Sequence, residues 1–535
     1  MISRLKSIFN FNTLILQFAV ILLAIPALLI NLGLFPLISD EPTRGIVTLE
    51  MMVSNNYIHP TINGEHYFNK PPLFNWIQAL LVKITGSMDE WVFRIPTVIS
   101  IIGLCVLIYS FSRKYLKEYA IAAALTFVVA GRVLFWDSFM GLIDITYSLV
   151  TFGSFAWMIH YHSKGKYLQF FIGSYVLAAI GFMLKGIPSV AFQGLSILCL
   201  LLYDKRIKQL FSWQHALGIL AFAGIVGSYY LTYSREFPLS QAIVTLFEQS
   251  NRLKSNDSFL TGWFLHLFEF PVNMFYEFAP VSILALLLLS KEVRHRTFEQ
   301  PYFKYVILLF GVNIIIYWLS ADMRSRYLFM LVPLLSIVLI KAYAVSELLN
   351  NKIYRIVKWI LFYGTLLVAV SLMIYPIWNE TREMAYVWPI SIALMCIALG
   401  LWIASYCNQR LILISLFGAL LIARIGFNLF NLPARMNSYP DESYRSGEIE
   451  AARLSLGHPL YILNDTPFNH DASFYITRER FGILKRIQVL AEPDAFYLAN
   501  QKNLHIFAEN STKYRVVYSF KIKLDETRLF LITKQ

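Results

Sequence analysis

The sequence is poor in charged residues. Asp, Glu, Lys and Arg make up only 15% of its 535 residues, against about 25% in soluble globular domains. This shortage excludes an ordinary cytosolic enzyme, a disordered protein and a coiled coil, all of which carry more charge. Its four cysteines are too few for a disulfide scaffold, and no pair has the spacing of metal ligands.

Several catalytic signatures are also missing. The sequence contains no P-loop, no dinucleotide-binding glycine pattern, no HExxH motif and no GxSxG motif. A nucleotide-driven or proteolytic activity therefore has no support. No internal repeat is visible either, so the inverted repeats that mark many secondary transporters are not evident.

Apolar residues dominate what is present. Hydrophobic residues make up 57% of the chain and aromatic residues 16%, as in proteins that contact lipid and the membrane–water interface. A membrane-spanning helix needs about 20 mostly apolar residues. Thirteen segments meet this requirement, namely 14–36, 92–112, 119–136, 143–161, 167–184, 187–203, 214–232, 271–290, 302–320, 327–347, 356–376, 386–405 and 410–430. The first segment is interpreted as a retained anchor, because no signal-peptide cleavage site follows it.

Basic clusters lie at alternate ends of these segments. They fall at residues 113–117, 164–166, 205–208, 291–296 and 352–358. The positive-inside rule places such clusters in the cytoplasm, together with the N-terminus. The net charge of +13 is therefore interpreted as a sign of orientation in the bilayer, not of nucleic-acid binding. An odd number of spans then predicts that the C-terminal tail lies outside the cytoplasm.

The composition divides the chain into two expected domains. Residues 1–435 are expected to form a polytopic α-helical membrane domain, with interfacial helices in its first outer loop, residues 37–91. Residues 436–535 mix short β-like runs, such as 459–463 and 514–520, with helical stretches. About 100 residues can bury a core of their own. We therefore expect a small extracytoplasmic α/β domain at the C-terminus.

The first outer loop begins with a chemically rich segment. Residues 39–45 read SDEPTRG, which is a helix-start signal. Helical spacing is expected to bring Arg44 near Asp40 and Glu41. The alternative is that Asp40 merely caps the helix beside a surface ion pair.

A turn is predicted further along the same loop. Asn63-Gly64 is a turn signal, and Tyr67 and Lys70 follow it. Pro71-Pro72 then begins a second amphipathic helix. Lys70 is therefore expected at the turn between two interfacial helices, although a lysine that only snorkels to the interface is the alternative.

The second outer loop contains two acidic residues. Asp137 and Asp144 are seven residues apart, so a helix would place them on one face. Asp144 precedes an apolar run, where a carboxylate is costly without a partner. The alternative to a functional role is a buried ion pair that fixes packing.

The remaining outer-side candidates are mostly basic or aromatic. They are Lys185, Arg252, His266, Arg324, Arg326 and Tyr327. A lone histidine is usually structural, whereas paired arginines beside aromatic residues match a lipid phosphate in a bidentate way. Together the loops predict a cavity at the outer interface, lined by carboxylates and cations. A general base with cations that hold a leaving phosphate is what sugar transfer from a lipid-linked phosphate requires.

At these residues the sequence resembles a known family. The segments DEPTRG, NGEHYFNKPPLFNWIQAL, DEWVFRIPTVIS, DSFMGLIDITYS, LKGIP and RSRYLFMLVP occur in this order over residues 14–345. This ordered set resembles the GT-C superfamily of polyprenyl-phosphate-sugar glycosyltransferases, specifically glycosyltransferase family 39 of the bacterial aminoarabinose transferase and protein mannosyltransferase type. The resemblance implies a multi-span enzyme of the bacterial inner membrane, with a periplasmic site and an undecaprenyl-phosphate-linked sugar as donor.

The resemblance also implies roles for individual residues. Asp40 falls on the family's candidate catalytic base, and Asp144 on the acidic residue of the second loop. The residues expected to bind substrate are Glu41, Arg44, Tyr67, Lys70, Arg252, Arg324, Arg326 and Tyr327. His266 falls where relatives carry a histidine that borders the site.

No cofactor follows from the sequence with certainty. His266 is the candidate ligand for a divalent metal, but Asn69 stands where relatives carry a Glu that can bind metal. This replacement argues against metal dependence. The expected partners are a polyprenyl-phosphate sugar, the bilayer, and an acceptor such as lipid A, another glycolipid or a protein. The alternative function is a transporter or flippase of lipid-linked sugars, which predicts charges at mid-span positions.

Overall fold

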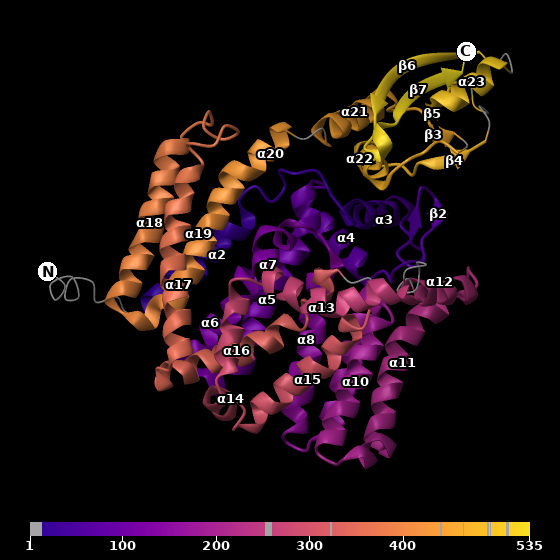
Figure 1. Ribbon diagram of the computed structural model, residues 1–535. Coiled ribbons are helices and arrows are strands. Elements are labelled where there is room, and N and C mark those ends of the chain that lie inside the picture. The colour runs from indigo at the N-terminus through magenta and orange to yellow at the C-terminus, as the bar shows by residue number, and fades with distance from the viewer. Residues whose placement is uncertain are drawn as a thin grey trace.

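The computed structural model describes residues 13–251, 259–320, 324–438, 441–463, 465–488, 492, 494–509 and 513–534. Within them, eight helices are long and apolar enough to cross a membrane, or nine if one bent pair is a single span. Figure 1 shows these helices as one bundle, with a separate β-containing domain above it. The predicted polytopic helical membrane fold with a small C-terminal sheet domain is confirmed.

The membrane domain is helical throughout apart from one small hairpin. Its first half contains α2 (Thr13–Leu29), α3 (Glu41–Ser54), β1 (Thr61–Ile62), β2 (Glu65–His66), α4 (Leu73–Thr85), α5 (Glu90–Leu116), α6 (Ala120–Val129), α7 (Gly131–Phe135), η2 (Asp137–Phe139), α8 (Ile143–His162), α9 (Tyr167–Lys185), α10 (Pro188–Tyr203), α11 (Trp213–Tyr233) and α12 (Leu239–Asn251). Its second half contains α13 (Phe259–Glu277), η5 (Val281–Leu289), α14 (Lys291–Thr297), α15 (Pro301–Trp318), η6 (Ser325–Leu328), α16 (Val332–Leu349), α17 (Lys352–Ser371), α18 (Val387–Cys407), α19 (Ile412–Gly426) and α20 (Leu432–Ser438).

Each of the thirteen apolar segments coincides with a helix or a helix pair. Some of these helices are shorter than a full span: α2 has 17 residues, α6 has 10 and α10 has 16. A helix rises about 1.5 Å per residue, so α6 alone covers only about half of a 30 Å hydrocarbon core. The count of thirteen crossings therefore stays a prediction, while the helical nature of the segments is confirmed.

The segment 271–290 is not one straight helix, which corrects the sequence expectation. The chain bends by 119° between the helix that ends at Glu277 and η5. Pro280 immediately precedes η5, and a proline lacks the N–H that would continue the first helix. An apolar run of suitable length therefore does not by itself specify a straight span.

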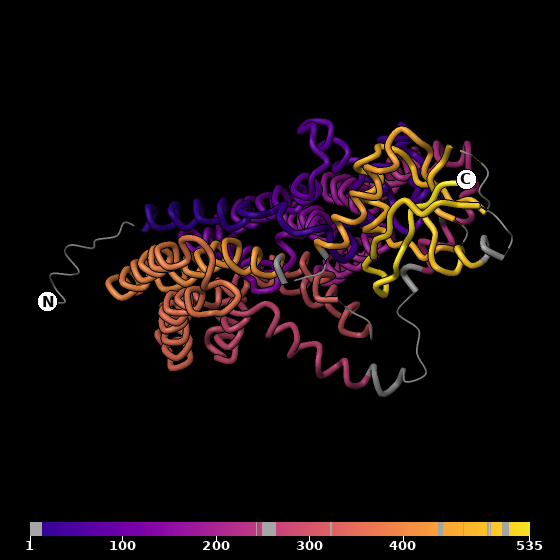
Figure 2. The backbone as a smooth tube through the Cα atoms, turned by 90° about the horizontal axis from the view of Figure 1, so that it is seen from above, coloured from indigo at the N-terminus to yellow at the C-terminus, as the bar shows by residue number. Residues whose placement is uncertain are grey.

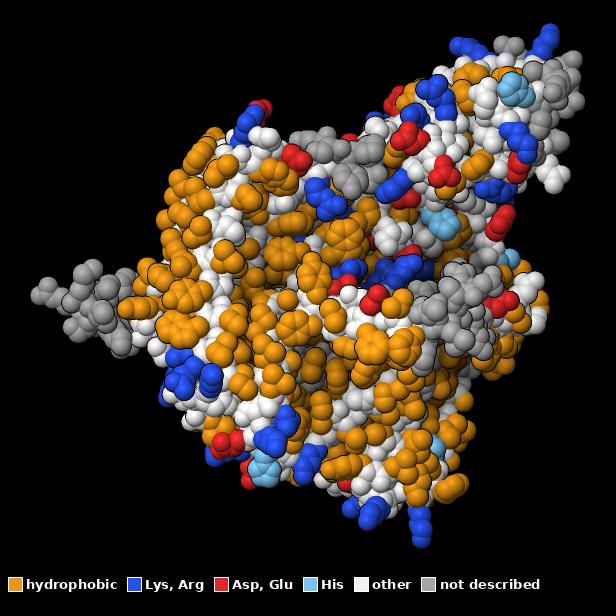
Figure 3. Space-filling model, in the orientation of Figure 1, with side chains coloured by type: hydrophobic (Ala, Val, Ile, Leu, Met, Phe, Trp, Pro, Cys, Tyr) orange, Lys and Arg blue, Asp and Glu red, His pale blue; other side chains and the backbone are white. Residues whose placement is uncertain are grey.

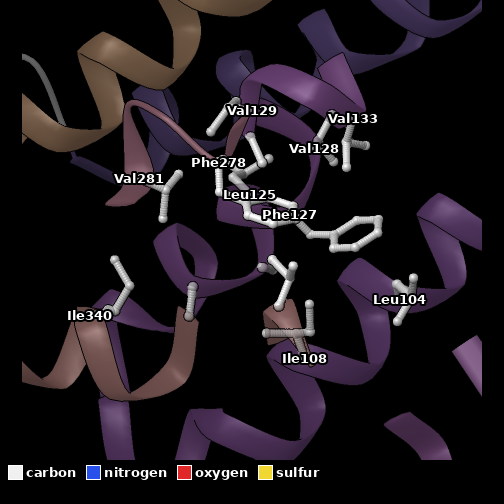
Figure 4. Packing of buried hydrophobic residues seen from close by; sticks show 14 of the residues in the cluster. Leu104, Ile108, Leu125, Phe127, Val128, Val129, Val133, Phe278, Val281 and Ile340 are labelled. Carbon is white, nitrogen blue, oxygen red and sulfur yellow. The ribbon is translucent and has the colours of Figure 1, made fainter. Parts of the chain in front are cut away.

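The main core lies where helices from both halves of the chain meet. Figure 4 shows α6 side chains, including Phe127 and Val128, surrounded by Leu104 of α5, Val281 of η5 and Ile340 of α16. All five of these residues are at most 5% exposed. This core joins segments more than 200 residues apart in the sequence, so the outer ends of the helices are held in fixed relative positions.

The first outer loop folds as predicted into two helices joined by a turn. Asn63 and Gly64 adopt positive φ angles of 53° and 77° between β1 and β2. The buried carboxylate of Glu50, on α3, accepts hydrogen bonds from the backbone N–H of Asn63 (2.6 Å) and the hydroxyl of Thr61 (2.6 Å). Burial raises the pKa of Glu50. This carboxylate fixes the hairpin that leads to Tyr67 and Lys70.

The C-terminal domain is a small α/β sandwich. Its elements are α21 (Asp441–Leu454), β3 (Leu460–Leu463), α22 (His470–Arg480), β4 (Lys485–Ile487), β5 (Phe496–Asn500), α23 (Gln501–Glu509), β6 (Tyr514–Lys521) and β7 (Arg528–Lys534). The sheet order is β4-β3-β5-β7-β6, with β3 parallel to β4 and β5 and the remaining pairs antiparallel. Helix α22 packs on α3, and in Figures 1 and 2 the domain lies at the end of the bundle where α3 is found.

Candidate active site

The site is built around a buried ion pair that ties the first outer loop to α5. Arg94 donates to both carboxylate oxygens of Glu41, at 2.8 and 3.0 Å. Its other N–H groups bind the backbone carbonyls of Leu32, Phe35 and Pro36 at 2.8–3.0 Å. Glu41 is only 1% exposed. Glu41 is therefore buried in an ion pair that joins the loop to α5, and its role in substrate binding stays a prediction.

Asp40 lies immediately before Glu41 in the chain and pairs with a different arginine. It is the first residue before α3, but its side chain makes no capping hydrogen bond, so the capping interpretation is not supported. Its carboxylate accepts a 2.5 Å hydrogen bond from Arg326, and its side chain is 56% exposed. Asp40 is therefore a charged group held in position yet open to an incoming molecule.

Asp144 belongs to the same network of charges. Its carboxylate accepts from the ammonium of Lys185 at 2.5 Å and lies 3.6 Å from Nε of Arg326. Lys185 also lies over the ring of Tyr327, at 4.4 Å from its centroid. Arg326 thus bridges the two acidic residues, and residues from α3, α8, α9 and η6 meet at one point.

Arg44 lies beside this network and near Asp40, as predicted, because its backbone N–H donates to the carbonyl of Asp40 at 3.2 Å. Its guanidinium donates to the hydroxyl of Tyr67 and lies over that ring, at 5.1 Å from the centroid. No salt bridge joins Arg44 to Asp40 or Glu41 among the described residues. Its Nη1 atom is buried and has no hydrogen-bond acceptor within the described structure. Nε of Arg326 also lacks a hydrogen bond there, but it faces the Asp144 carboxylate at 3.6 Å.

Lys70 adds a further positive charge. The pKa of its ammonium falls from 10.5 to about 8, chiefly through burial and also through the nearby cations Lys185 and Arg44. The neighbouring carboxylates Asp40 and Asp144 act in the opposite direction. A bound anion would relieve this crowding of cations. Figure 3 shows Lys and Arg side chains gathered in the hollow beneath the C-terminal domain.

Asp137 does not share a helix face with Asp144, contrary to the sequence expectation. Asp137 belongs to η2, whereas Asp144 lies in the first turn of α8. Asp137 instead accepts a 2.6 Å hydrogen bond from Arg132. Burial raises its pKa to about 6, against the opposing effect of Arg132. This pair fixes the second outer loop beside the site.

The other predicted site residues lie in different situations. Tyr327 borders the Arg326–Lys185 network, whereas Arg324 is exposed. Arg252 lies outside the described residues. A ring nitrogen of His266 lies 3.3 Å from the carbonyl oxygen of Tyr317. Over the described ranges, no group of three His, Cys, Asp or Glu side chains is arranged to hold a metal ion.

Two important residues were missed as site residues. Lys185 belongs to the LKGIP segment but was not assigned a role. It ends an apolar helix, where burying a charged side chain is energetically costly and therefore indicates a functional residue. Arg94 stood in DEWVFRIP at the start of an apolar segment. The cost of burying a charge would have identified Arg94 as well, because a buried arginine requires an acidic partner.

Comparisons with known proteins find similar sequences for part of the chain. Residues 69–230 match the family model described as dolichyl-phosphate-mannose-protein mannosyltransferase. The chain is 26% identical over 204 residues to an undecaprenyl phosphate-alpha-4-amino-4-deoxy-L-arabinose arabinosyl transferase of Proteus mirabilis, which covers 37% of each chain. The corresponding protein of Pseudomonas savastanoi is 29% identical over 204 residues, or 37% of this chain and 38% of that one. The chain thus matches little more than a third of these relatives' length.

The similarity to solved structures extends over the whole fold. The chain superposes on ArnT from Cupriavidus metallidurans in its apo state with a TM-score of 0.67 and 16% identity, covering 96% of this chain and 97% of that one. The same protein bound to undecaprenyl phosphate gives a TM-score of 0.67 with 15% identity. The chain therefore shares the fold of ArnT over nearly its whole length, and residues 69–230 match the mannosyltransferase family model.

Proposed function

We propose that the protein is a glycosyltransferase that moves a sugar from a polyprenyl phosphate, such as undecaprenyl phosphate, to an acceptor at the membrane surface. The observation that carries this proposal is the charge of the site. Four cations, Arg44, Lys70, Lys185 and Arg326, surround two carboxylates, Asp40 and Asp144. The excess positive charge, together with the Nη1 group of Arg44 that has no acceptor in the described structure, suits a lipid phosphate.

The proposed reaction uses these groups in defined roles. Asp40 takes the proton from an acceptor hydroxyl as the acceptor oxygen attacks the anomeric carbon of the donor sugar. The bond from that carbon to the phosphate oxygen breaks, and its electron pair leaves with the polyprenyl phosphate. Arg44, Lys70 and Arg326 stabilise the negative charge that develops there. An acceptor phosphate would need no proton removal, and Asp40 would then orient it.

The position of the charges favours transfer over transport. Asp40 lies just before α3, Asp144 in the first turn of α8, Lys185 at the end of α9 and Arg326 in the short η6. All four therefore lie at helix ends rather than at mid-span, where a transport pathway would require them. The acceptor is a lipid A phosphate, another glycolipid or a protein hydroxyl, and the assay below separates these classes.

A transfer assay tests this function directly. Purified protein is incubated with a radiolabelled polyprenyl-phosphate sugar and, in separate reactions, with envelope lipids or envelope proteins. We expect label to appear in one acceptor fraction and unlabelled polyprenyl phosphate to inhibit its appearance, because it would occupy the same cationic site. If the labelled sugar crosses the membrane of sealed vesicles while still attached to the polyprenyl carrier, the result would instead support a flippase.

The orientation is also proposed from charge. Figure 3 shows Lys and Arg side chains gathered at the end of the molecule opposite the C-terminal domain, beyond a broad apolar belt. The positive-inside rule makes that end cytoplasmic. We therefore place the site and the C-terminal domain in the periplasm, with the protein in the bacterial inner membrane.

A reporter phosphatase that works only outside the cytoplasm checks this orientation. Fused after Gln535, it is expected to be active, because the C-terminal domain covers the site at the outer end. Fused after Lys208, in a basic segment at the opposite end, it is expected to be inactive. The reverse pattern would contradict the proposed orientation.

Transfer is further proposed to need no divalent metal ion. Asn69 brings no charge, and the site's acidic groups Asp40 and Asp144 already pair with cations, so neither is free to join His266 in binding a metal ion; the described residues contain no group of three ligands that could hold one. We expect full activity after dialysis against a strong chelator, measured by the same transfer assay. Activity that disappears in chelator and returns with added zinc or magnesium would contradict this, and His266 would then be the first ligand to replace.

A further inference from the structure

Helix α22 of the C-terminal domain contacts the catalytic loop on both sides of Asp40. The hydroxyl of Tyr475 accepts a 2.9 Å hydrogen bond from the backbone N–H of Leu37. A ring nitrogen of His470 lies 2.8 Å from the hydroxyl of Thr43. The same helix therefore holds the chain three residues before Asp40 and three residues after it.

The ring of Phe474 closes the gap between these two contacts. It packs so tightly on α3 that a Cβ added at Gly45 would lie only 2.6 Å from the ring. Phe474 is fully buried and also contacts Phe93 of α5, with ring centroids 5.2 Å apart. α3 and α22 are thus in close contact at the one residue of α3 that lacks a side chain.

An ionic contact holds the two domains together nearby. Glu90, at the start of α5, accepts from Arg445 of α21 at 3.0 Å and from Arg478 of α22 at 3.4 Å. The Glu90 side chain is only 6% exposed. Because the group is buried and paired twice, we expect the contact to resist screening by salt. The C-terminal domain is therefore docked on the membrane domain rather than loosely tethered.

The loop needs such support. Ser39, directly before Asp40, has a φ of +60°, a left-handed conformation that residues other than glycine rarely adopt. Such strain persists only when surrounding contacts hold it. Arg94 fixes the loop from the membrane side through Glu41, and Tyr475 fixes it from the opposite side through Leu37.

We propose that α22 is the positioning element of the catalytic loop, with Tyr475 as a positioning residue that keeps the Asp40 carboxylate in its reactive place. This inference rests on the proposed function, since it assigns the C-terminal domain a part in the same reaction. Tyr475 does not touch the reacting atoms and acts only through the backbone of Leu37. Its loss therefore affects the chemical step and not the binding of the donor.

The test compares two buried tyrosines whose hydroxyls each accept a hydrogen bond from a backbone N–H. Tyr475→Phe removes a hydroxyl that accepts one backbone N–H, and Tyr497→Phe removes a buried hydroxyl that accepts the N–H of Glu492 at the same 2.9 Å. Tyr497 lies on β5, in the sheet of the domain. We expect Tyr475→Phe to lower kcat about tenfold with the KM for the donor unchanged. Tyr497→Phe is expected to leave both constants unchanged.

Amide hydrogen exchange provides a second measurement that does not depend on activity. Exchange at residues 37–45 is expected to accelerate in Tyr475→Phe and to stay at the wild-type rate in Tyr497→Phe. Unchanged exchange, or faster exchange with unchanged kcat, would overturn the positioning role. If wild-type protein transfers no sugar, the proposed function fails, and the exchange rates still decide whether α22 holds the loop.

Discussion

Replacing Asp40 by Asn is expected to reduce sugar transfer about 10²–10⁴-fold, the usual effect of losing a general base. Asparagine keeps the size of the side chain but cannot accept a proton from the acceptor. Asp40 is the exposed acidic group of the network, whereas Asp144 is only 10% exposed. The reduction is therefore expected in kcat, measured with purified protein and radiolabelled donor.

Two controls separate a catalytic role from a structural one. Asp89→Asn changes an exposed acidic residue of the same loop, which precedes α5 and binds Ser87 at 2.8 Å. It is expected to transfer sugar at the wild-type rate. Asp40→Asn protein is expected to elute and melt like wild type, because the side chain is 56% exposed and the amide oxygen can still accept from Arg326. Near wild-type transfer by Asp40→Asn would refute the proposed mechanism.

Local sequence signals predicted the components of the site well. The helix-start segment at Asp40, the turn at Asn63-Gly64 and the lysine that follows it all depend on neighbouring residues, and all three have the predicted local structure. Apolar length likewise predicted helices correctly, because burial in lipid depends on composition. Such features are encoded within a few residues, so a single sequence reveals them.

Pairings between distant residues could not be predicted in the same way. Helical spacing predicted only that Arg44 lies near Asp40 and Glu41, about one helical turn away, and did not name the ion-pair partners of the two acidic residues. In the structure Glu41 pairs with Arg94, 53 residues away, and Asp40 with Arg326, 286 residues away. These pairs form because α5 and η6 pack against the first outer loop. Spacing along one helix cannot reveal that packing.

The second outer loop illustrates the same limit. Helical spacing put Asp137 and Asp144 on one face, but the chain leaves the helix between them. The carbonyl of Met140 accepts from Thr97 at 2.7 Å, and the N–H of Gly141 donates to Glu41 at 2.6 Å. A Cβ at Gly141 would lie 2.4 Å from the carbonyl oxygen of Phe93, so only glycine fits. Contacts with α5 and α3 therefore override the local helical pattern.

Replacing Arg94 by Met is expected to destabilise the protein more than any other single change considered. The variant leaves the Glu41 carboxylate buried without its cation and removes the donors to the carbonyls of Leu32, Phe35 and Pro36. Removing one partner of a buried ion pair typically costs about 3–5 kcal/mol. We expect a large fall in the apparent melting temperature of detergent-solubilised protein, and a lower folded yield.

An exposed arginine of the same helix provides the matched control. Arg113 lies near the other end of α5 and is exposed, so Arg113→Met should melt within a few degrees of wild type, because surface changes usually cost less than about 0.5 kcal/mol. If Arg94→Met melts like Arg113→Met, the Glu41–Arg94 pair does not hold the loop. In that case Asp40 would depend on Arg326 and α22 alone for its position, and Tyr475→Phe should then have the larger effect on stability.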